Sequence, residues 1–440
     1  MSPPRRSRPS HANLPGARTP AGGDAAARAR RLRQAPAGAS DPTVRLQAVP
    51  NRREALGARR AAQRNRARAR RRRFVVLGLT LVVLLGVVIG GGLYVYSTVF
   101  TNPDFEGTGT GDVVVQVHDG DSTTQIGNTL ADRGVVASVE AFTKAASTDE
   151  RVRAVQPGYY QMKVKMSAAS AVTLLLAPTT RVGQLEIKGG VQLDDTRAGD
   201  GAVVPGVLNL ISQATCATIG GEKKCVSVDE LRAAMVGTDP AALGVPSWAL
   251  EAVGKADPAR RLEGLLVPGR YDVAPGTPAT EVLHGLLTTS AARLQASGLV
   301  SGAQTIGSTP YQVLIISSLV EKEAITADMP KVARVIYNRL GVGQRLELDS
   351  MVNYPLDLQA LRTTPEDRAR PGPYNSYAEA GLPPTPIAAP GRDAIAAAIA
   401  PAEGPWLFFV RCRTDGTSCF AQTLPEHQAN VAMAEQNGAI

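Results

Sequence analysis

Residues that bind metal ions are scarce in this sequence. Its 440 residues include four cysteines and four histidines, and no two cysteines form a Cys-x-x-Cys pair. Zinc sites are normally built from clusters of Cys and His, so we expect no metal ion. The sequence also has neither a Ser-His-Asp series nor a glycine-rich phosphate loop that follows a strand. We therefore expect no nucleotide or other cofactor.

Acidic residues and lysine are nearly absent from residues 1–73, which hold 20 arginines, no lysine and three acids. This segment carries a formal charge of +17, whereas the whole chain carries +9 and the remainder therefore −8. A nucleic-acid-binding fold needs its own basic face, so no nucleic acid is expected as a partner. Residues 1–73 also lack clustered apolar residues, which predicts a disordered, Arg-rich tail.

Charged residues are missing altogether from 74–100, where Val, Leu, Ile and Gly dominate. About 20 apolar residues cross a bilayer, so we predict a transmembrane helix, which is longer than the apolar core of a signal peptide. Arginines crowd its N-terminal side, including the run at 68–73, and acids follow it. The positive-inside rule predicts a cytoplasmic tail and an extracytoplasmic region after about residue 101. The chain is thus expected in the cell membrane as a single-pass protein, although the arginine run can also bind RNA or anionic lipid.

The four cysteines form two close pairs along the chain, Cys216 with Cys225 and Cys412 with Cys419. In a non-cytoplasmic region this spacing favours two local disulfides. Four cysteines allow three pairings, and four free thiols are the other alternative, so the connectivity stays open at this point.

Strand and helix patterns alternate along the outer region, which predicts an α+β fold. It divides into a linker, a small α+β unit, a connecting α+β region and a C-terminal catalytic core, at residues 101–111, 112–180, 181–307 and 308–435. In the last part Ser308-Thr309-Pro310 predicts a helix start, because a hydroxyl caps a helix and proline fits its first turn. The other expected elements are strands at 113–117, 158–162, 184–187, 406–410 and 419–422, helices at 139–146, 279–297, 329–340 and 393–399, a loop-rich stretch at 189–226 and an ordered loop at 374–391.

One carboxylate stands where an apolar helical stripe should continue. Glu323 follows Val313, Ile316 and Val320 on one helical face. Burial raises the pKa of a carboxyl, which suits a general acid at neutral pH. Glu321 falls on a less apolar face and is expected to be solvated. The alternative interpretation of this Glu-Lys-Glu run is a charged surface at the end of a helix.

Six short motifs occur in order in the C-terminal part. They are Ser-Ser-Leu-Val-Glu-Lys-Glu at 317–323, Tyr-Asn-Arg-Leu at 337–340, Arg-Leu-Glu-Leu-Asp at 345–349, Tyr-Asn-Ser-Tyr at 374–377, Gly-Leu-Pro-Pro at 381–384 and Leu-Phe-Phe-Val at 407–410. Together they resemble the MltG (YceG-like) family of bacterial endolytic murein transglycosylases, over about residues 112–435. Where that family commonly has Gly-x-His-x-Phe, this chain has Ser418-Cys419-Phe420.

The resemblance implies a membrane-anchored lytic transglycosylase. Such an enzyme cleaves the β-1,4 bond between N-acetylmuramic acid and N-acetylglucosamine in nascent peptidoglycan, leaves a 1,6-anhydro end and terminates strand growth. The second glutamate of the Glu-Lys-Glu motif is catalytic in that family and corresponds to Glu323. The implied partners are peptidoglycan glycan strands, the cytoplasmic membrane and, as further candidates, peptidoglycan synthases. The unit at 112–180 resembles, more loosely, the family's LysM-like subdomain.

Several other residues fall in matching motifs. The candidate substrate-binding residues are Asn338, Asp349, Tyr374 and Asn375. For each of them, a role in a cap, a turn or packing is the competing interpretation. Glu263 and His427 also fall at matching positions, and structural roles are favoured for both.

Two other functions compete with this hypothesis. A hydrolytic muramidase normally needs two carboxyl groups roughly 5–10 Å apart, and the patterns single out one. The other is a non-catalytic, peptidoglycan-binding scaffold of the wall-synthesis machinery. An apolar environment around Glu323 beside an open groove would favour the enzyme over the scaffold.

Overall fold

The computed structural model describes residues 74–92, 103–359 and 363–440. It divides into two compact units, residues 1–92 and 93–440, and each is considered by itself. The predicted disordered tail and residues 93–100 of the predicted transmembrane run lie outside the described residues.

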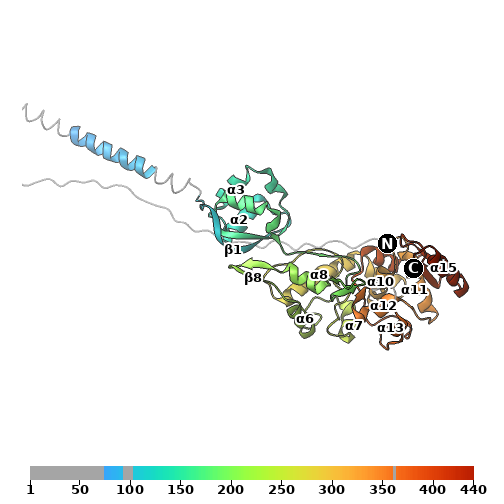
Figure 1. Ribbon diagram of the computed structural model, residues 1–440. Coiled ribbons are helices and arrows are strands. Elements are labelled where there is room, and N and C mark those ends of the chain that lie inside the picture. Colours follow the sequence, from blue (N-terminus) through green and yellow to red (C-terminus); the bar gives the residue numbers. More distant parts are fainter. Residues whose placement is uncertain (1–73, 93–102, 360–362) are drawn as a thin grey trace, which may run out of the picture. The chain divides into compact units, whose positions relative to one another are not determined.

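The described part of the first unit is the helix Phe74–Gly92, drawn in blue in Figure 1. Its 19 residues have a mean hydropathy of 2.7, and its large apolar side chains are exposed. The hydroxyl of Thr80 donates to the carbonyl oxygens of Val76 and Leu77, at 2.8 and 3.0 Å. By its length and composition the helix can span a membrane.

The second unit starts with a small α+β subdomain. Its sheet has the order β1-β2-β3, with both strand pairs antiparallel. Three helices pack on it, and Leu130, Phe142 and Met162 are fully buried between the layers. The elements are β1 (Thr108–Val117), α2 (Thr123–Asp132), α3 (Val139–Ala146), η1 (Glu150–Ala154), β2 (Gly158–Met166), α4 (Ala168–Leu175), η2 (Pro178–Thr180) and β3 (Arg181–Val182).

Strand β1 begins five residues earlier than expected, so part of the predicted linker at 101–111 belongs to the sheet. The strand is irregular between Thr110 and Asp112, where its register with β2 shifts. Gly109 has a φ of +80°, and a Cβ there would lie 2.5 Å from the side chain of Met166. Its glycine is therefore required by close packing in the sheet, and not by a flexible linker.

The stretch at 189–226, predicted to be loop-rich, holds more regular structure than expected. It contains four strands and a helix that buries Val207, Leu208, Ile211 and Ala214. That helix starts at Gly206 without a side-chain cap, so the sequence carries no capping signal there. These elements are β5 (Thr196–Ala198), β6 (Val203–Val204), α5 (Val207–Ala214), β7 (Ala217–Ile219) and β8 (Glu222–Lys224).

The second unit also contains several short sheets and two disulfides. Strand β4 (Gln184–Ile187) pairs with β9 (Gly269–Asp272), and β10 (Leu358–Gln359) joins β5 and β6. Near the C-terminus β11 (Phe408–Arg411) pairs with β12 (Ser418–Ala421). Both local disulfides, Cys216–Cys225 and Cys412–Cys419, are present. Each closes a two-stranded hairpin, which confirms the pairing by proximity.

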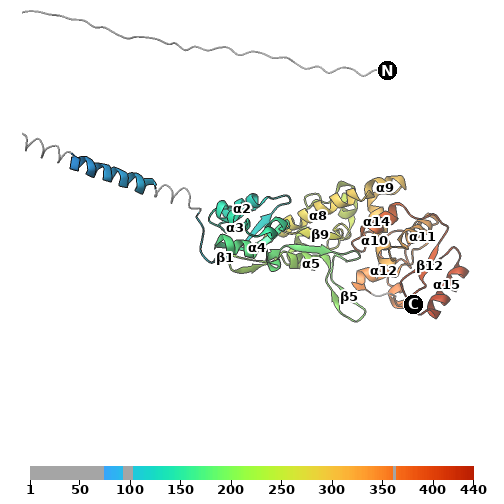
Figure 2. The same ribbon diagram turned by 90° about the horizontal axis from the view of Figure 1, so that it is seen from above.

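Helix α10 (Pro310–Glu323) lies in the core of the C-terminal part. It packs against α9 (Leu299–Thr305), α11 (Met329–Gly341), α12 (Asp349–Asn353) and α14 (Arg392–Ile399), and Figure 2 shows α10 beside α11, α12 and α14. The hydroxyl of Thr309 accepts from the backbone N–H of Gln312 in a capping box, as Ser308-Thr309-Pro310 predicts. Every residue at 313–320 is buried, so α10 is enclosed on all sides and not along one stripe only.

The remaining helices surround this core. They are α6 (Val228–Gly237), η3 (Ser247–Ala249), α7 (Leu250–Lys255), α8 (Ala279–Ala296), η4 (Tyr354–Leu356), α13 (Pro365–Ala369) and α15 (Leu424–Gln436). The Pro-rich segment 374–391 forms neither helix nor strand, as expected. The predicted α+β class is thus confirmed.

Candidate functional site

The Glu-Lys-Glu run is the last turn of α10. Val313, Ile316 and Val320, which precede Glu323 on its face of the helix, are at most 1% exposed. Each turn of the helix is therefore held by the core, and its C-terminal end presents Glu323 at a defined place. The structure thus puts the acid at the end of a rigid, buried element.

Glu323 itself is half-buried. The hydroxyl of Ser350, on α12, donates to its Oε1 atom. Burial of the carboxyl raises the pKa of Glu323, the nearby charge of Asp349 raises it further, and the Ser350 hydrogen bonds and Lys322 oppose the shift. A carboxyl in this setting keeps its proton at a higher pH than an ordinary glutamate, which is the property that a general acid needs.

Glu321 is half-buried, so it is less solvated than expected. Its Oε2 atom accepts from the backbone N–H of Gly391 at 2.9 Å, and burial raises its pKa. A Cβ on Gly189 would lie only 2.2 Å from Glu321 Oε1. Two glycine-containing segments, far apart in the sequence, therefore pack closely against the Glu321 carboxyl.

Lys322 lies between the two glutamates and is also partly buried. Its Nζ atom donates to the carbonyl oxygen of Gly190 at 3.3 Å. Burial lowers the pKa of Lys322, while the carboxylates of Glu323, Glu263 and Glu321 oppose this shift. The end of α10 therefore concentrates three ionisable groups in a setting with little solvent.

Among the candidate binding residues, Asp349 is the one whose charge raises the pKa of Glu323. It opens α12, directly before Ser350, and its charge acts on Glu323. Its Oδ1 atom accepts from Tyr377 Oη at 2.8 Å and from Thr363 Oγ1 at 2.5 Å. Thr363 and Tyr377 were not among the predicted site residues, because only the packing of the 363–377 segment makes them neighbours of Asp349. Ser350 was not predicted either, because its contact with Glu323 joins two helices.

Tyr374 and Asn375 lie beside a cavity of about 260 Å³. Tyr374 Oη is 2.7 Å from the hydroxyl of Thr385, and Asn375 Nδ2 donates to the carbonyl oxygen of Arg368 at 2.7 Å. The lining of this cavity includes Val352, which lies in α12, and residues 355–356, which follow that helix. Both candidates therefore shape a hollow that borders the helix contacting Glu323, and both also hold the loop that forms it.

Asn338 and His427 belong to a different contact region. Asn338 Nδ2 donates to the carbonyl oxygens of Gly404 and Trp406, at 3.0 and 2.8 Å. His427 stacks on Phe408, with ring centroids 5.3 Å apart, and burial lowers its pKa. Both side chains fasten the C-terminal hairpin onto α11 or α15, as the structural interpretation expects.

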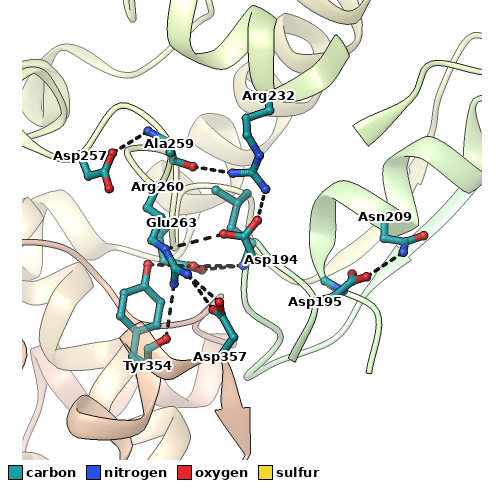
Figure 3. Close-up of polar contacts among 12 residues, drawn as sticks. Asp194, Asp195, Asn209, Arg232, Asp257, Ala259, Arg260, Glu263, Tyr354 and Asp357 are labelled. Atoms are coloured by element: carbon teal, nitrogen blue, oxygen red, sulfur yellow. Dashed lines mark hydrogen bonds and ion pairs between the residues drawn. The ribbon is translucent and has the colours of Figure 1, made fainter. Parts of the chain in front are cut away.

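A second buried carboxyl, Glu263, is at the centre of Figure 3. It is 2% exposed, and burial raises its pKa to about 7. Both of its oxygens accept from the backbone N–H of Leu193, at 3.1 and 3.0 Å, and Tyr354 Oη donates to Oε2 at 3.2 Å. These hydrogen-bond partners, a backbone amide and a phenol hydroxyl, give Glu263 a structural role, as expected.

No group of three or more His, Cys, Asp or Glu residues with metal-binding geometry occurs in residues 74–92, 103–359 and 363–440. Over that part of the chain the fold and site define a class: a mixed α+β protein that presents a partly accessible acid of raised pKa at the end of an enclosed helix. The chain belongs to the YceG-like family, whose model matches residues 115–433.

Two curated proteins and one solved structure are similar to this chain. A protein of Streptococcus pneumoniae serotype 2 (strain D39) named endolytic murein transglycosylase is 25% identical over 365 residues, which cover 80% of this chain and 64% of the relative. This chain thus spans less than two thirds of that relative's length. A protein of the same name from Bacillus subtilis (strain 168) is 25% identical over 350 residues, 77% of this chain and 89% of the relative. A crystal structure of a YceG-like protein from Listeria monocytogenes is 23% identical, with a TM-score of 0.48, and covers 72% of this chain and 98% of that one.

Proposed function

We propose that this protein is a membrane-anchored endolytic lytic transglycosylase that cleaves nascent peptidoglycan strands. The observation that carries the proposal is Glu323, a half-buried acid of raised pKa at the end of the enclosed helix α10. The activity named for the relatives in Streptococcus pneumoniae and Bacillus subtilis supports the same conclusion.

Glu323 acts first as an acid and then as a base. Its carboxyl donates a proton to the glycosidic oxygen as the bond from C1 of N-acetylmuramic acid to N-acetylglucosamine breaks. The carboxylate then accepts the proton of the muramic 6-hydroxyl as that oxygen bonds to C1, which closes the 1,6-anhydro ring and restores the acid. One carboxyl is sufficient because the nucleophile belongs to the substrate, whereas a hydrolase needs a second carboxyl to activate water or to attack.

The glycan groove follows the elements around α12 in this proposal. Tyr374 and Asn375 bind the sugar from the lining of the 260 Å³ cavity, and Asp349 binds it from the start of α12. Asn338, on α11, binds the glycan through its amide oxygen, because its amide nitrogen already donates to the carbonyl oxygens of Gly404 and Trp406. These four assignments are tested by their effect on KM, because binding residues alter ground-state affinity more than the proton transfer.

The helix Phe74–Gly92 anchors the enzyme in the cytoplasmic membrane, with the tail 1–73 in the cytoplasm and the catalytic part outside. The anchor restricts cleavage to glycan near the membrane, where new strands emerge, so the enzyme terminates strand growth. The subdomain with β1–β3 acts as a LysM-like module that binds peptidoglycan, and peptidoglycan synthases are the candidate protein partners.

Two substitutions on the same helix test the proposal. Full-length protein in detergent is incubated with uncrosslinked glycan strands, and the ends are identified by mass spectrometry, since an anhydro end is lighter than a hydrated one by one water. Glu323→Gln should abolish anhydro ends, whereas Glu321→Gln should keep them, because its side-chain oxygen can still accept from Gly391. Hydrated ends from the wild type would indicate a muramidase. Glycan binding without cleavage would indicate a scaffold.

A further inference from the structure

A buried carboxylate lies behind the catalytic end of α10. We infer that Glu263 is a positioning residue for Glu323. Glu263 joins the two segments that contact the Glu-Lys-Glu turn, and it has no contact with the glycan itself. This inference rests on the proposed function, because Glu323 is the acid to be positioned. It goes further by assigning a catalytic effect to a residue that the substrate cannot reach.

The first segment is 189–193. Its last residue, Leu193, donates its backbone N–H to both oxygens of Glu263, at 3.1 and 3.0 Å. The first part of the segment lies against the C-terminal end of α10. There the carbonyl oxygen of Gly190 accepts from Lys322 Nζ, and Gly189 packs against the carboxyl of Glu321. Glu263 therefore fixes the far end of a five-residue segment whose near end touches the residues before Glu323.

The second segment is α12 and the residue that follows it. Tyr354 is fully buried, and its Oη atom donates to Glu263 Oε2 at 3.2 Å. Four residues earlier, the hydroxyl of Ser350 donates to Glu323. Because α12 spans only Asp349–Asn353, a displacement of Tyr354 is transmitted over little more than one helical turn to the donor that holds the catalytic carboxyl.

The loop that carries Glu263 also contacts Tyr354 through a network of ion pairs, as Figure 3 shows. Arg260 lies three residues before Glu263, and its guanidinium is 5.1 Å from the centre of the Tyr354 ring. It also donates to the carbonyl oxygen of Tyr354 at 3.4 Å and to Asp357 at 2.8 Å. Asp194, next to Leu193, pairs with Arg260 at 3.7 Å. The 260–263 loop thus grips both segments at once.

The chemistry of the contact requires a carboxyl group. Glu263 faces donors only, a backbone N–H and a phenol, and a carboxylate accepts on both of its oxygens. Glutamine has the same volume but would point an NH₂ group at one of these donors. Glu263→Gln should therefore break one contact without leaving a cavity, and its 2% exposure means that the substitution removes no contact with glycan.

The experiment compares Glu263→Gln and Tyr354→Phe in the full-length protein, with kcat and KM measured from the release of anhydro ends. A displacement of a catalytic group by about 1 Å can cost about 100-fold in rate, so kcat should fall roughly 10- to 100-fold for Glu263→Gln and less for Tyr354→Phe. KM should stay within about twofold, because binding of the glycan is not altered. Combining Glu263→Gln with Ser350→Ala should cost less than the product of the two separate losses, since both act on Glu323.

The matched control is Ser290→Ala. Ser290 is equally buried, and its hydroxyl interacts with Val267 N and Tyr271 Oη at 3.3 and 2.9 Å. This variant loses comparable hydrogen bonds in another part of the core, so its kcat should equal that of the wild type. A similar fall in kcat for Ser290→Ala and Glu263→Gln would show general destabilisation and overturn the inference. If Glu263→Gln does not fold, Tyr354→Phe against the same control decides the question.

A readout without catalysis separates this inference from the proposed function. Carbodiimide modifies protonated carboxyl groups, and the rate at Glu323 can be followed by mass spectrometry of its peptide. The rate should change severalfold in Glu263→Gln and stay unchanged in Ser290→Ala. An altered rate in a protein that forms no anhydro ends would refute the function and keep the positioning role. An unchanged rate together with an unchanged kcat would refute the positioning role alone.

Discussion

The carboxyls of Glu323 and Glu263 both act on Lys322, yet they differ in access. Glu323 is half-buried and accepts a hydrogen bond from the hydroxyl of Ser350. Glu263 is 2% exposed and accepts from Leu193 and Tyr354. Burial raises the pKa of both groups. A raised pKa alone therefore does not identify a catalytic acid, and access for a substrate separates the two.

The largest expected effect sharpens this difference. Glu323→Gln should lower the rate of anhydro-end formation by about 10²- to 10⁴-fold, the usual contribution of a positioned general acid. Its free energy of unfolding should stay the same or rise, because a half-buried ionisable group is replaced by a neutral one whose oxygen can still accept from Ser350. Initial rates and urea denaturation measure both quantities. If Glu323→Gln is strongly destabilised, Glu323 has a structural role like that of Glu263, and the difference between the two carboxyls does not hold.

The pH dependence of the free energy of unfolding tests the burial of Glu263. Burial raises its pKa from 4.5 to about 7, so between these values the folded state binds more protons than the unfolded state. The free energy of unfolding should therefore fall as the pH rises from 4.5 to 7 and then level off, by about 3 kcal/mol from this group.

The measurement is urea denaturation at pH 5 and pH 7.5. Burial also raises the pKa of Glu321 and Glu323, so the wild type should show their combined slope. Glu263→Gln should lose its share and give a shallower one. Equal slopes in both proteins would mean that Glu263 titrates normally.

Gly189 tests how closely Glu321, the third carboxyl of this region, is enclosed. A Cβ at residue 189 would lie 2.2 Å from Glu321 Oε1, so Gly189→Ala should destabilise the protein by about 1–3 kcal/mol. Gly254→Ala is the control, since it lies in α7 with no atom within 4 Å of an added Cβ, and should be neutral or slightly stabilising. Equal melting temperatures for the two variants would contradict the close contact.

The smallest effect concerns Ser350. Its hydrogen bonds lower the pKa of Glu323 against the effect of burial, so Ser350→Ala should raise that pKa further. The alkaline limb of the kcat/KM profile should then move to higher pH, because Glu323 keeps its proton longer. Thr363→Ala, which removes a donor to Asp349 and not to Glu323, provides the comparison. A shift to lower pH in Ser350→Ala would contradict the contact.

Local patterns in the sequence predicted much of the fold around α10. The Thr309 cap, the stripe that ends at Glu323 and the helix at 329–340 all depend on residues within four positions of each other, and they agree with α10 and α11. Helix α5 was missed because Gly206 provides no capping side chain. The extended β1 was missed because the glycine at 109 reads as a linker until Met166 packs against it.

The sequence by itself determined the α+β class, the apolar helix and the choice of Glu323 as the candidate acid, since each follows from periodicity or composition. Tertiary structure alone decided the pairing of the four cysteines, the contact of Glu321 with Gly391 and the hydrogen bond from Ser350 to Glu323. It also decided that Glu263 touches both Leu193 and Tyr354. Those hydrogen bonds join residues 27 to 91 positions apart, and only the packed chain makes such residues neighbours.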